Sequence, residues 1–168
     1  MSGIVSSNGV KVARGVVAGA IAGAAASFAM DRFQAAVSAL SSDDDGAQAE
    51  PATEKAADAV AERVTGREVA DEDKPLAGQA VHYALGIGLG VLYGIAAEFR
   101  PAVTAGYGSA FGLGTATVLD EGVVPAVGLG QAPWQASASS NLYSYASHLV
   151  FGGTAELVRR QVAGTLRT

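Results

Sequence analysis

The charged residues of this 168-residue chain are concentrated in one block, and the rest of the sequence is almost free of charge. Twelve of the sixteen acids and five of the eleven bases lie between Asp31 and Lys74, which leaves four acids and six bases for the other 124 residues. Charged residues make up 16% of the chain, against about 25% in an ordinary soluble domain. Long apolar stretches with so little charge predict helices that lie in a membrane.

Four apolar segments are long enough, or nearly so, to cross a bilayer, because about 20 helical residues span its hydrocarbon layer. We predict an all-α, polytopic membrane bundle that forms a single domain, with four spans at about 12–30, 76–99, 101–119 and 143–158. The first segment has an alternative interpretation as a secretory signal peptide, since Ser27 and Ala29 are spaced like a cleavage site.

The acidic block at residues 31–75 is predicted to be a polar loop that contains one amphipathic helix. Pro51 begins this helix and Gly66 ends it, and one face is apolar, formed by Ala57, Val60, Ala61 and Val64. The three aspartates at 43–45 predict a solvated turn, because they lack the spaced ligands of a calcium loop.

Residues 122–142 are apolar but contain two prolines and several glycines, which interrupt a helix. We predict a loop or re-entrant segment at the membrane surface, with Trp134 at the depth of the lipid headgroups. No Lys or Arg occurs in the connection at 119–142. The opposite side carries six bases: Lys11, Arg14, Arg100, Arg159, Arg160 and Arg167. The positive-inside rule therefore predicts that both termini lie in the cytoplasm and that the acidic loop lies outside.

Glycines recur at four-residue spacing in the first three spans, which is the spacing of one helix ridge. The sets are Gly15, Gly19 and Gly23; Gly86, Gly90 and Gly94; and the pairs Gly108 with Gly112 and Gly106 with Gly114. We predict Gly-xxx-Gly packing within the bundle, with a spare glycine face for a homo-oligomer or a partner subunit as the alternative. A soluble Ala-rich bundle is disfavoured, because each glycine costs a water-exposed helix about 1 kcal/mol.

Five ionisable residues are predicted to lie at one depth near the outer ends of the spans: Asp31, His82, Asp120, Glu121 and His148. Such residues are expensive inside a membrane, so they indicate a candidate site. Histidines and carboxylates on facing helices are ligands for Zn²⁺, Fe or Mn²⁺. The alternatives are mutual hydrogen bonding at helix ends and a path for protons or a solute. Cysteine is absent, which excludes thiolate ligands.

A second group of charges is predicted at the inner ends of the spans: Glu98, Arg100, Glu156, Arg159 and Arg160. Ion pairs such as that of Glu156 with Arg159 or Arg160 would anchor the helix ends at the cytoplasmic surface. Tyr93 follows His82 by eleven residues and therefore lies on nearly the same helix face. We predict that it is a core tyrosine with a hydrogen-bond partner.

Several short stretches resemble a known family: 82–86 (HYALG), 92–94 (LYG), 120–122 (DEG), 125–129 (PAVGL), 133–135 (PWQ), 148–152 (HLVFG) and 154–156 (TAE). Over residues 77–160 the chain is similar to the YagU-type bacterial inner-membrane proteins, a family of unknown function. The resemblance implies a small polytopic membrane protein and supplies no activity.

The sequence shows no Ser-His-Asp order, phosphate loop or nucleotide signature that would indicate an enzyme. Its net charge of −5 argues against a nucleic-acid partner. The function predicted is that of a non-enzymatic structural or accessory subunit of a membrane assembly, whose partners are the lipid bilayer and other subunits. A metal- or cofactor-binding bundle and a small oligomeric proton-linked permease are the alternatives.

Overall fold

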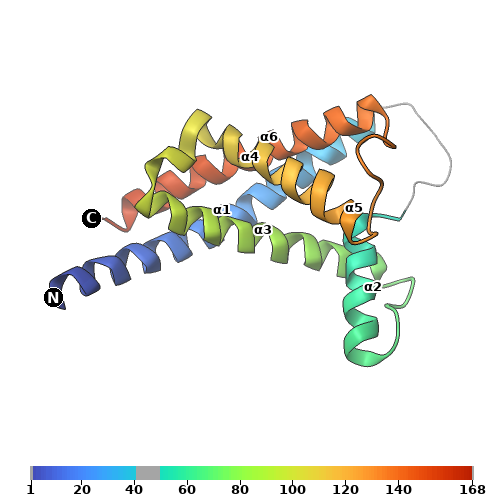
Figure 1. Ribbon diagram of the computed structural model, residues 1–168, viewed down its shortest axis with the longest axis horizontal. Helices are drawn as coiled ribbons and strands as arrows, with labels where there is room; N and C mark the ends of the chain where they lie inside the picture. The colour runs from blue at the N-terminus through green and yellow to red at the C-terminus, as the bar shows by residue number, and fades with distance from the viewer. Residues whose placement is uncertain (1, 41–49, 168) are drawn as a thin grey trace.

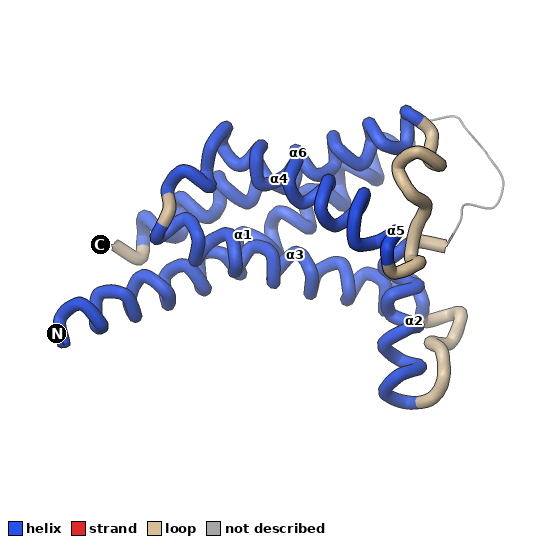
Figure 2. The backbone as a smooth tube through the Cα atoms, in the orientation of Figure 1, coloured by secondary structure: helices blue, strands red, loops and turns tan. Residues whose placement is uncertain are grey.

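A computed structural model describes residues 2–40 and 50–167, and in these ranges the chain is helical, with no strand. The prediction of an all-α chain is confirmed (Figure 2). The aspartate run at 43–45 lies outside the described residues. The elements in chain order are α1 (Ser2–Leu40), α2 (Ala52–Thr65), α3 (Lys74–Phe99), η1 (Pro101–Gly108), α4 (Ser109–Thr115), η2 (Ala116–Val123), α5 (Val124–Ala126) and α6 (Ala138–Thr165).

Helices α1, α3 and α6 lie along the long axis of the molecule (Figure 1), and α1 packs against both of the others. The continuous helical stretch from α4 to α5 packs along α6 (Figure 1). The N-terminus, the C-terminus and the turn after α3 are found at one end of the bundle, while α2 lies across the other end (Figure 1).

The seam between α1 and α3 is made of backbone-to-backbone contacts. It is lined by three glycines from each helix: Gly15, Gly19 and Gly23 of α1, and Gly86, Gly90 and Gly94 of α3. A Cβ atom on Gly90 would lie 2.7 Å from the Cα of Gly23, and one on Gly94 would lie 2.8 Å from the Cα of Gly19. Real Cβ atoms do not approach so closely, so glycine at these positions permits the two helices to touch.

The seam between α1 and α6 contains larger apolar side chains. Ala26 and Met30 of α1 form a buried cluster with Phe151 and Ala155 of α6. Phe111 of α4 packs against this cluster. The core is therefore small, and it lies where α1, α6 and α4 come together.

Helix α1 is longer than the predicted span at 12–30, because it continues without a break to Leu40. The prediction ended this segment at the Asp31–Arg32 charge pair. Charge alone does not end a helix, and residues 31–40 contain no Gly or Pro to interrupt it. The helix predicted at 76–99 is found as α3, which begins at Lys74.

The helix expected at 101–119 begins later in the structure, at Ser109, and ends later, at Ala126. Gly106, Tyr107 and Gly108, the last three residues of η1, all have positive φ (63°, 56° and 84°), which turns the chain before the next helix starts at Ser109. Gly106 therefore serves a turn, and Gly114 faces open space, so this pair makes no helix-packing contact. Glycine adopts such left-handed conformations at little cost.

The helix that begins at Ser109 continues to Ala126, with wider π-type turns at Ala116–Val123. A π-type segment leaves some backbone groups outside the regular ladder, which accommodates Pro125 directly after it. The predicted loop at 122–142 is accordingly shorter, at 127–137. Helix α6 begins at Ala138, where Ser137 accepts a hydrogen bond from the N–H of Ser140 (3.1 Å). It is longer at both ends than the predicted 143–158.

Helix α2 confirms the amphipathic helix expected after Pro51, but most of its apolar face is not covered. Ala57 is buried, whereas Val60 and Val64 are 61% and 79% exposed. The helix is attached to the start of α3 by Asp58, whose carboxylate lies 2.9 Å from Nζ of Lys74. The Lys74 ammonium, together with the N–H of Val69, holds the pKa of the Asp58 carboxyl below its usual value.

Two helices are long and apolar enough to cross a membrane, Ser7–Leu40 and Lys74–Phe99, among the residues that the structure describes. The rest of the chain covers less than half of each, since 39% and 22% of their apolar windows are buried. The core helix of a soluble protein would be mostly buried.

Candidate functional site

A fully buried carboxylate, that of Glu156, organises the end of the bundle near the two termini. Arg159 donates two hydrogen bonds of 2.8 Å to its two oxygens, and Arg160 donates a third. The hydroxyl of Tyr93, on α3, donates a bond of 2.7 Å. The single charge is thus surrounded by donors from two helices, which is the condition under which a buried charge is tolerated.

The spacing of the sequence explains these contacts. Arg159 and Arg160 follow Glu156 by three and four residues, so all three share one side of α6. Tyr93 is held by its ring, which stacks on Phe111 of α4 with 4.2 Å between the centroids. The side chain expected to be a hydrogen-bonded core tyrosine therefore lies between α3, α4 and α6.

A second ion-pair group lies at the same end, where α1, α3 and α6 finish or begin. The carboxylate of Glu98 is 2% exposed and pairs with Arg14 of α1. It also lies 3.3 Å from Nη2 of Arg167, in the chain after α6. Among the described residues, Arg100 makes no ion pair and is exposed, so it does not take part in the predicted group.

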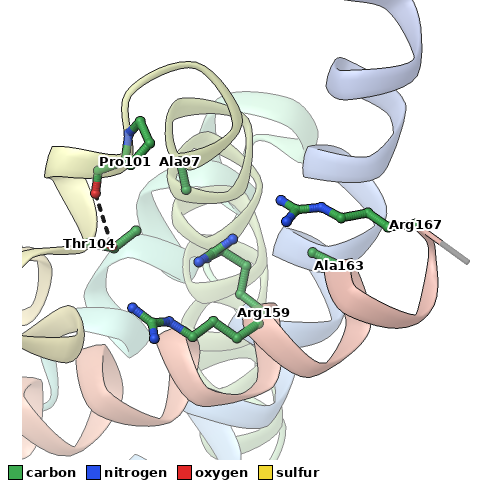
Figure 3. A pocket seen from close by; sticks show the side chains of 7 residues that line it. Ala97, Pro101, Thr104, Arg159, Ala163 and Arg167 are labelled. Atoms are coloured by element: carbon green, nitrogen blue, oxygen red, sulfur yellow. Dashed lines mark hydrogen bonds between the residues drawn. The ribbon is translucent and has the colours of Figure 1, made fainter.

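Beside these ion pairs lies a cavity of about 350 Å³ between α6 and the turn after α3. Three of its lining side chains are arginines, namely Arg159, Arg160 and Arg167. Figure 3 shows Arg159 and Arg167 extending from the α6 side of the cavity, with Thr104 and Pro101 on the opposite wall. The Thr104 hydroxyl is used within that wall, where it donates to the carbonyl oxygen of Pro101 (2.8 Å).

The position of Arg160 is fixed by a residue in an unusual backbone conformation. Tyr107 has φ 56°, the only positive φ of a non-glycine residue in the described chain. The centre of its ring lies 4.2 Å from the guanidinium carbon of Arg160, a cation–π contact. Left-handed backbone at a bulky residue costs free energy, and such strain is concentrated at functional sites.

The residues predicted as an outer polar layer are found as two separate pairs. His82 Nε2 lies 3.2 Å from Asp31 Oδ1, at ion-pair distance but without hydrogen-bond geometry. Gln79 donates a bond of 2.7 Å to the other Asp31 oxygen. This pair joins α3 to α1.

The second pair joins α6 to the π-type segment η2. His148 Nδ1 lies 3.6 Å from Asp120 Oδ2 and 2.9 Å from the carbonyl oxygen of Ser144. The Ser144 hydroxyl donates to the same Asp120 oxygen at 2.8 Å. Glu121 makes no hydrogen bond or ion pair with the residues described.

In the part of the chain that the structure describes, no three His, Asp or Glu side chains lie close enough to hold one metal ion. The five residues proposed as ligands are thus arranged as His–carboxylate pairs, with Glu121 in neither. A metal at either pair would need further ligands. Binding of Zn²⁺, Fe or Mn²⁺ there stays a prediction.

Sequence reasoning grouped Glu156 with its arginines but missed the cavity beside them. Thr104 is not among the residues that the sequence singles out, and Arg14 and Arg167 enter the prediction only through the orientation of the helices. The sequence contains a signal for this site, because four arginines and two glutamates lie near helix ends that are predicted to be on the same side of the membrane. The turn at Gly106–Gly108, which follows the cavity wall formed by Pro101 and Thr104, cannot be located from apolar periodicity.

No curated protein and no solved structure matches the chain. A family described as "Protein of unknown function (DUF1440)" matches residues 55–157, a stretch from α2 into α6. It contains His82, Tyr93, Asp120, His148 and Glu156. Since this match covers more than half of the sequence, the chain belongs to the DUF1440 family.

Proposed function

We propose that this protein is a multi-pass, YagU-type inner-membrane protein that acts as a structural or accessory subunit of a membrane assembly. The observation that carries the proposal is where the small and the large apolar residues lie, which is the reverse of their arrangement in a soluble bundle. The inward faces of α1 and α3 consist mostly of glycine and alanine, while most of their large apolar side chains lie on the outward faces. A soluble bundle shows the opposite pattern.

The outward side chains form stripes along three helices. On each helix, one set of exposed large apolar residues recurs at intervals of four, seven or eight residues, which keeps that set on one helix face. They are Val10, Val17, Ile21 and Phe28 of α1, Leu85, Leu92 and Phe99 of α3, and Leu142, Leu149 and Leu157 of α6. Lipid contact on these faces would account for all three stripes, including that of α6, whose polar residues His148 and Glu156 are buried.

The first experiment replaces Leu85, near the middle of α3 and 52% exposed, by lysine. In a water-soluble protein an exposed Leu85→Lys change would be harmless. In a membrane span it costs about 2.5–3.5 kcal/mol of insertion free energy. We therefore expect the wild-type chain to remain in the membrane pellet after alkaline carbonate extraction, and Leu85→Lys to lower the amount recovered there severalfold.

Val64→Lys provides the matched control, because Val64 is 79% exposed on α2, outside both membrane-length helices. We expect this variant to be recovered like the wild type. Release of the wild-type chain by carbonate, or equal recovery of both lysine variants, would contradict insertion of α3 in a membrane.

The role as a subunit is supported by small residues on the outer surface of α3. Ala84 and Gly88 are exposed and one helical turn apart, and a Cβ atom on Gly88 would meet nothing within 4 Å. This gap would admit another helix at close range, the way in which helices associate in lipid. Glycine is otherwise a costly residue in a helix.

Full-length tagged protein, extracted from its native membrane in mild detergent, is expected to purify in a complex larger than the monomer. Gly88→Leu should reduce the recovery of its partner chains, because leucine fills the gap on α3. Gly164→Leu is the control, since Gly164 also has open space around it but lies beyond Arg159 and Arg160, which end the apolar part of α6. A wild-type chain that runs as a monomer in light scattering would exclude the subunit role.

A further inference from the structure

The arginine-lined cavity beside Glu156 contains more positive charge than its neighbouring carboxylates neutralise. Four arginines meet at this end of the bundle, Arg14, Arg159, Arg160 and Arg167, and they pair with only two glutamates, Glu98 and Glu156. The group therefore has a formal surplus of two positive charges. Positive charges held close together repel one another, and a bound anion would relieve that repulsion.

The donors needed to bind such an anion are free and accessible. Arg160 uses only its Nε atom to bind Glu156, and within the described chain its two Nη groups make no hydrogen bond. Arg167 uses one Nη atom, at 3.3 Å from Glu98. The side chains of Arg160 and Arg167 are 44% and 58% exposed, so a ligand can reach them from outside.

The geometry favours an oxyanion with several oxygens. A guanidinium presents its N–H groups in a planar fork that matches phosphate oxygens. Tyr107 holds the plane of Arg160 from one side, and Arg159 is fixed by its two bonds to Glu156. The Thr104 hydroxyl already donates to Pro101, so the arginines supply the donors.

From this arrangement we infer that the cavity formed by Arg159, Arg160 and Arg167 binds a phosphate group, either as a free anion or as part of a phospholipid headgroup. The volume of about 350 Å³ is at the lower end of the range for small-molecule sites, roughly 300–1,000 Å³. Basic pockets between helices at the cytoplasmic surface are known to bind phosphate-bearing lipid headgroups. The inference goes beyond the proposed function, since binding of free phosphate does not require that the helices span a membrane.

The test uses the full-length protein in a non-ionic detergent and two probes. Inorganic phosphate is titrated by calorimetry, and retention of phosphatidylglycerol or phosphatidylcholine is measured by native mass spectrometry. The double variant Arg160→Gln/Arg167→Gln removes the two accessible donors. We expect it to weaken binding at least about tenfold, the equivalent of losing one charge-assisted hydrogen bond.

The control is Arg63→Gln/Arg67→Gln, which removes the same charge from two exposed positions at and beyond the end of α2, far from the cavity. We expect it to bind like the wild type. If inorganic phosphate binds and its binding depends on the cavity arginines, the ligand is a free anion. If only phosphatidylglycerol is retained, the ligand is a lipid headgroup. If neither probe binds, or if both double variants lose binding equally, the inference is overturned.

Should the cavity double variant lose helical circular dichroism, the single variant Arg167→Gln replaces it. Arg167 is the most exposed of the three arginines and lies after the end of α6, so its loss should leave the fold intact. We expect binding to weaken about threefold or more, as for one exposed charge contact. Unchanged binding in this variant and in Arg160→Gln alike would also overturn the inference.

Discussion

Replacing Glu156 by alanine is expected to lower the free energy of unfolding by about 3–5 kcal/mol, the cost of breaking a buried ion pair from one side. Glu156 is fully buried and accepts bonds from Tyr93, Arg159 and Arg160. Arg160 can turn its guanidinium into water, because its side chain is 44% exposed. Arg159 cannot, since it is only 7% exposed, and it would keep a buried charge without its counter-ion.

The measurement is chemical denaturation of the detergent-solubilised chain, followed by helical circular dichroism. Glu121→Ala is the matched control, because it removes a carboxylate that makes no hydrogen bond or ion pair within the described chain. Substitutions away from packed cores and hydrogen-bond networks usually alter stability by about 0.5 kcal/mol or less. If the two alanine variants lower the free energy of unfolding equally, the hydrogen bonds and ion pairs of Glu156 do not stabilise the fold.

A second variant separates the loss of the ion pair from the loss of packing. Replacing both partners, as Glu156→Leu/Arg159→Met, removes the uncompensated charge and keeps much of the side-chain volume. Buried ion pairs replaced in this way are often neutral in their effect on stability. We therefore expect the double variant to recover most of the stability lost in Glu156→Ala, which a double-mutant cycle would report as coupling between the two sites.

The sequence predicted helices best where one physical signal was strong and continuous. The uncharged stretch within α1 and the whole of α3 were recognised from their length and apolarity. The C-terminal end of α1 lies ten residues beyond the predicted one, because the Asp31–Arg32 pair is not a boundary of the helix itself. In the structure Asp31 remains helical and turns its carboxylate toward Gln79 and His82 of α3. Charge marks a change of environment, which is different from the end of a helix.

The region after Pro101 differs from the prediction because glycine serves either in a left-handed turn or on a helix-packing ridge, and the sequence does not distinguish these two uses. Gly108 lies in the left-handed region, yet a Cβ atom on it would also meet Gly152 and Glu156 of α6. Gly106 adopts a left-handed turn and packs on no other helix. Four-residue spacing suggested a packing ridge for both. The choice between turn and ridge depends on contacts with α6, which are distant in sequence.

For the candidate site, the predicted helix ends indicate how far along the bundle each polar residue lies, but not which residues contact one another. Sequence positions put Asp31, His82, Asp120 and His148 near one end of the bundle. Which histidine faces which carboxylate depends on the rotation of each helix, and that is set by the glycine seam and the Phe151 cluster. The structure consequently shows two pairs.

Replacing Gly90 by alanine is expected to cost about 1–3 kcal/mol of folding free energy, as for an overpacked core. A methyl group there would lie 2.7 Å from the Cα of Gly23 and closer still to the carbonyl oxygen of Gly19. Both are backbone atoms of α1, so no side chain can rotate away, and the two helices must separate. Separation removes close contacts along the whole seam, which in a membrane are the main attraction between helices.

Gly88→Ala is the control, two residues away on the same helix, with nothing within 4 Å of its added Cβ. Because alanine favours a helix over glycine by about 1 kcal/mol, we expect this variant to be as stable as the wild type or more so. Denaturation in detergent should therefore shift the two variants in opposite directions, although each adds one methyl group to α3. If both are stabilised, α1 and α3 are not in backbone contact, and the arrangement that positions Glu98 against Arg14 would be wrong as well. If both are destabilised, the outer face of α3 is covered in the native assembly, and the partner subunit proposed for Gly88 remains bound after extraction.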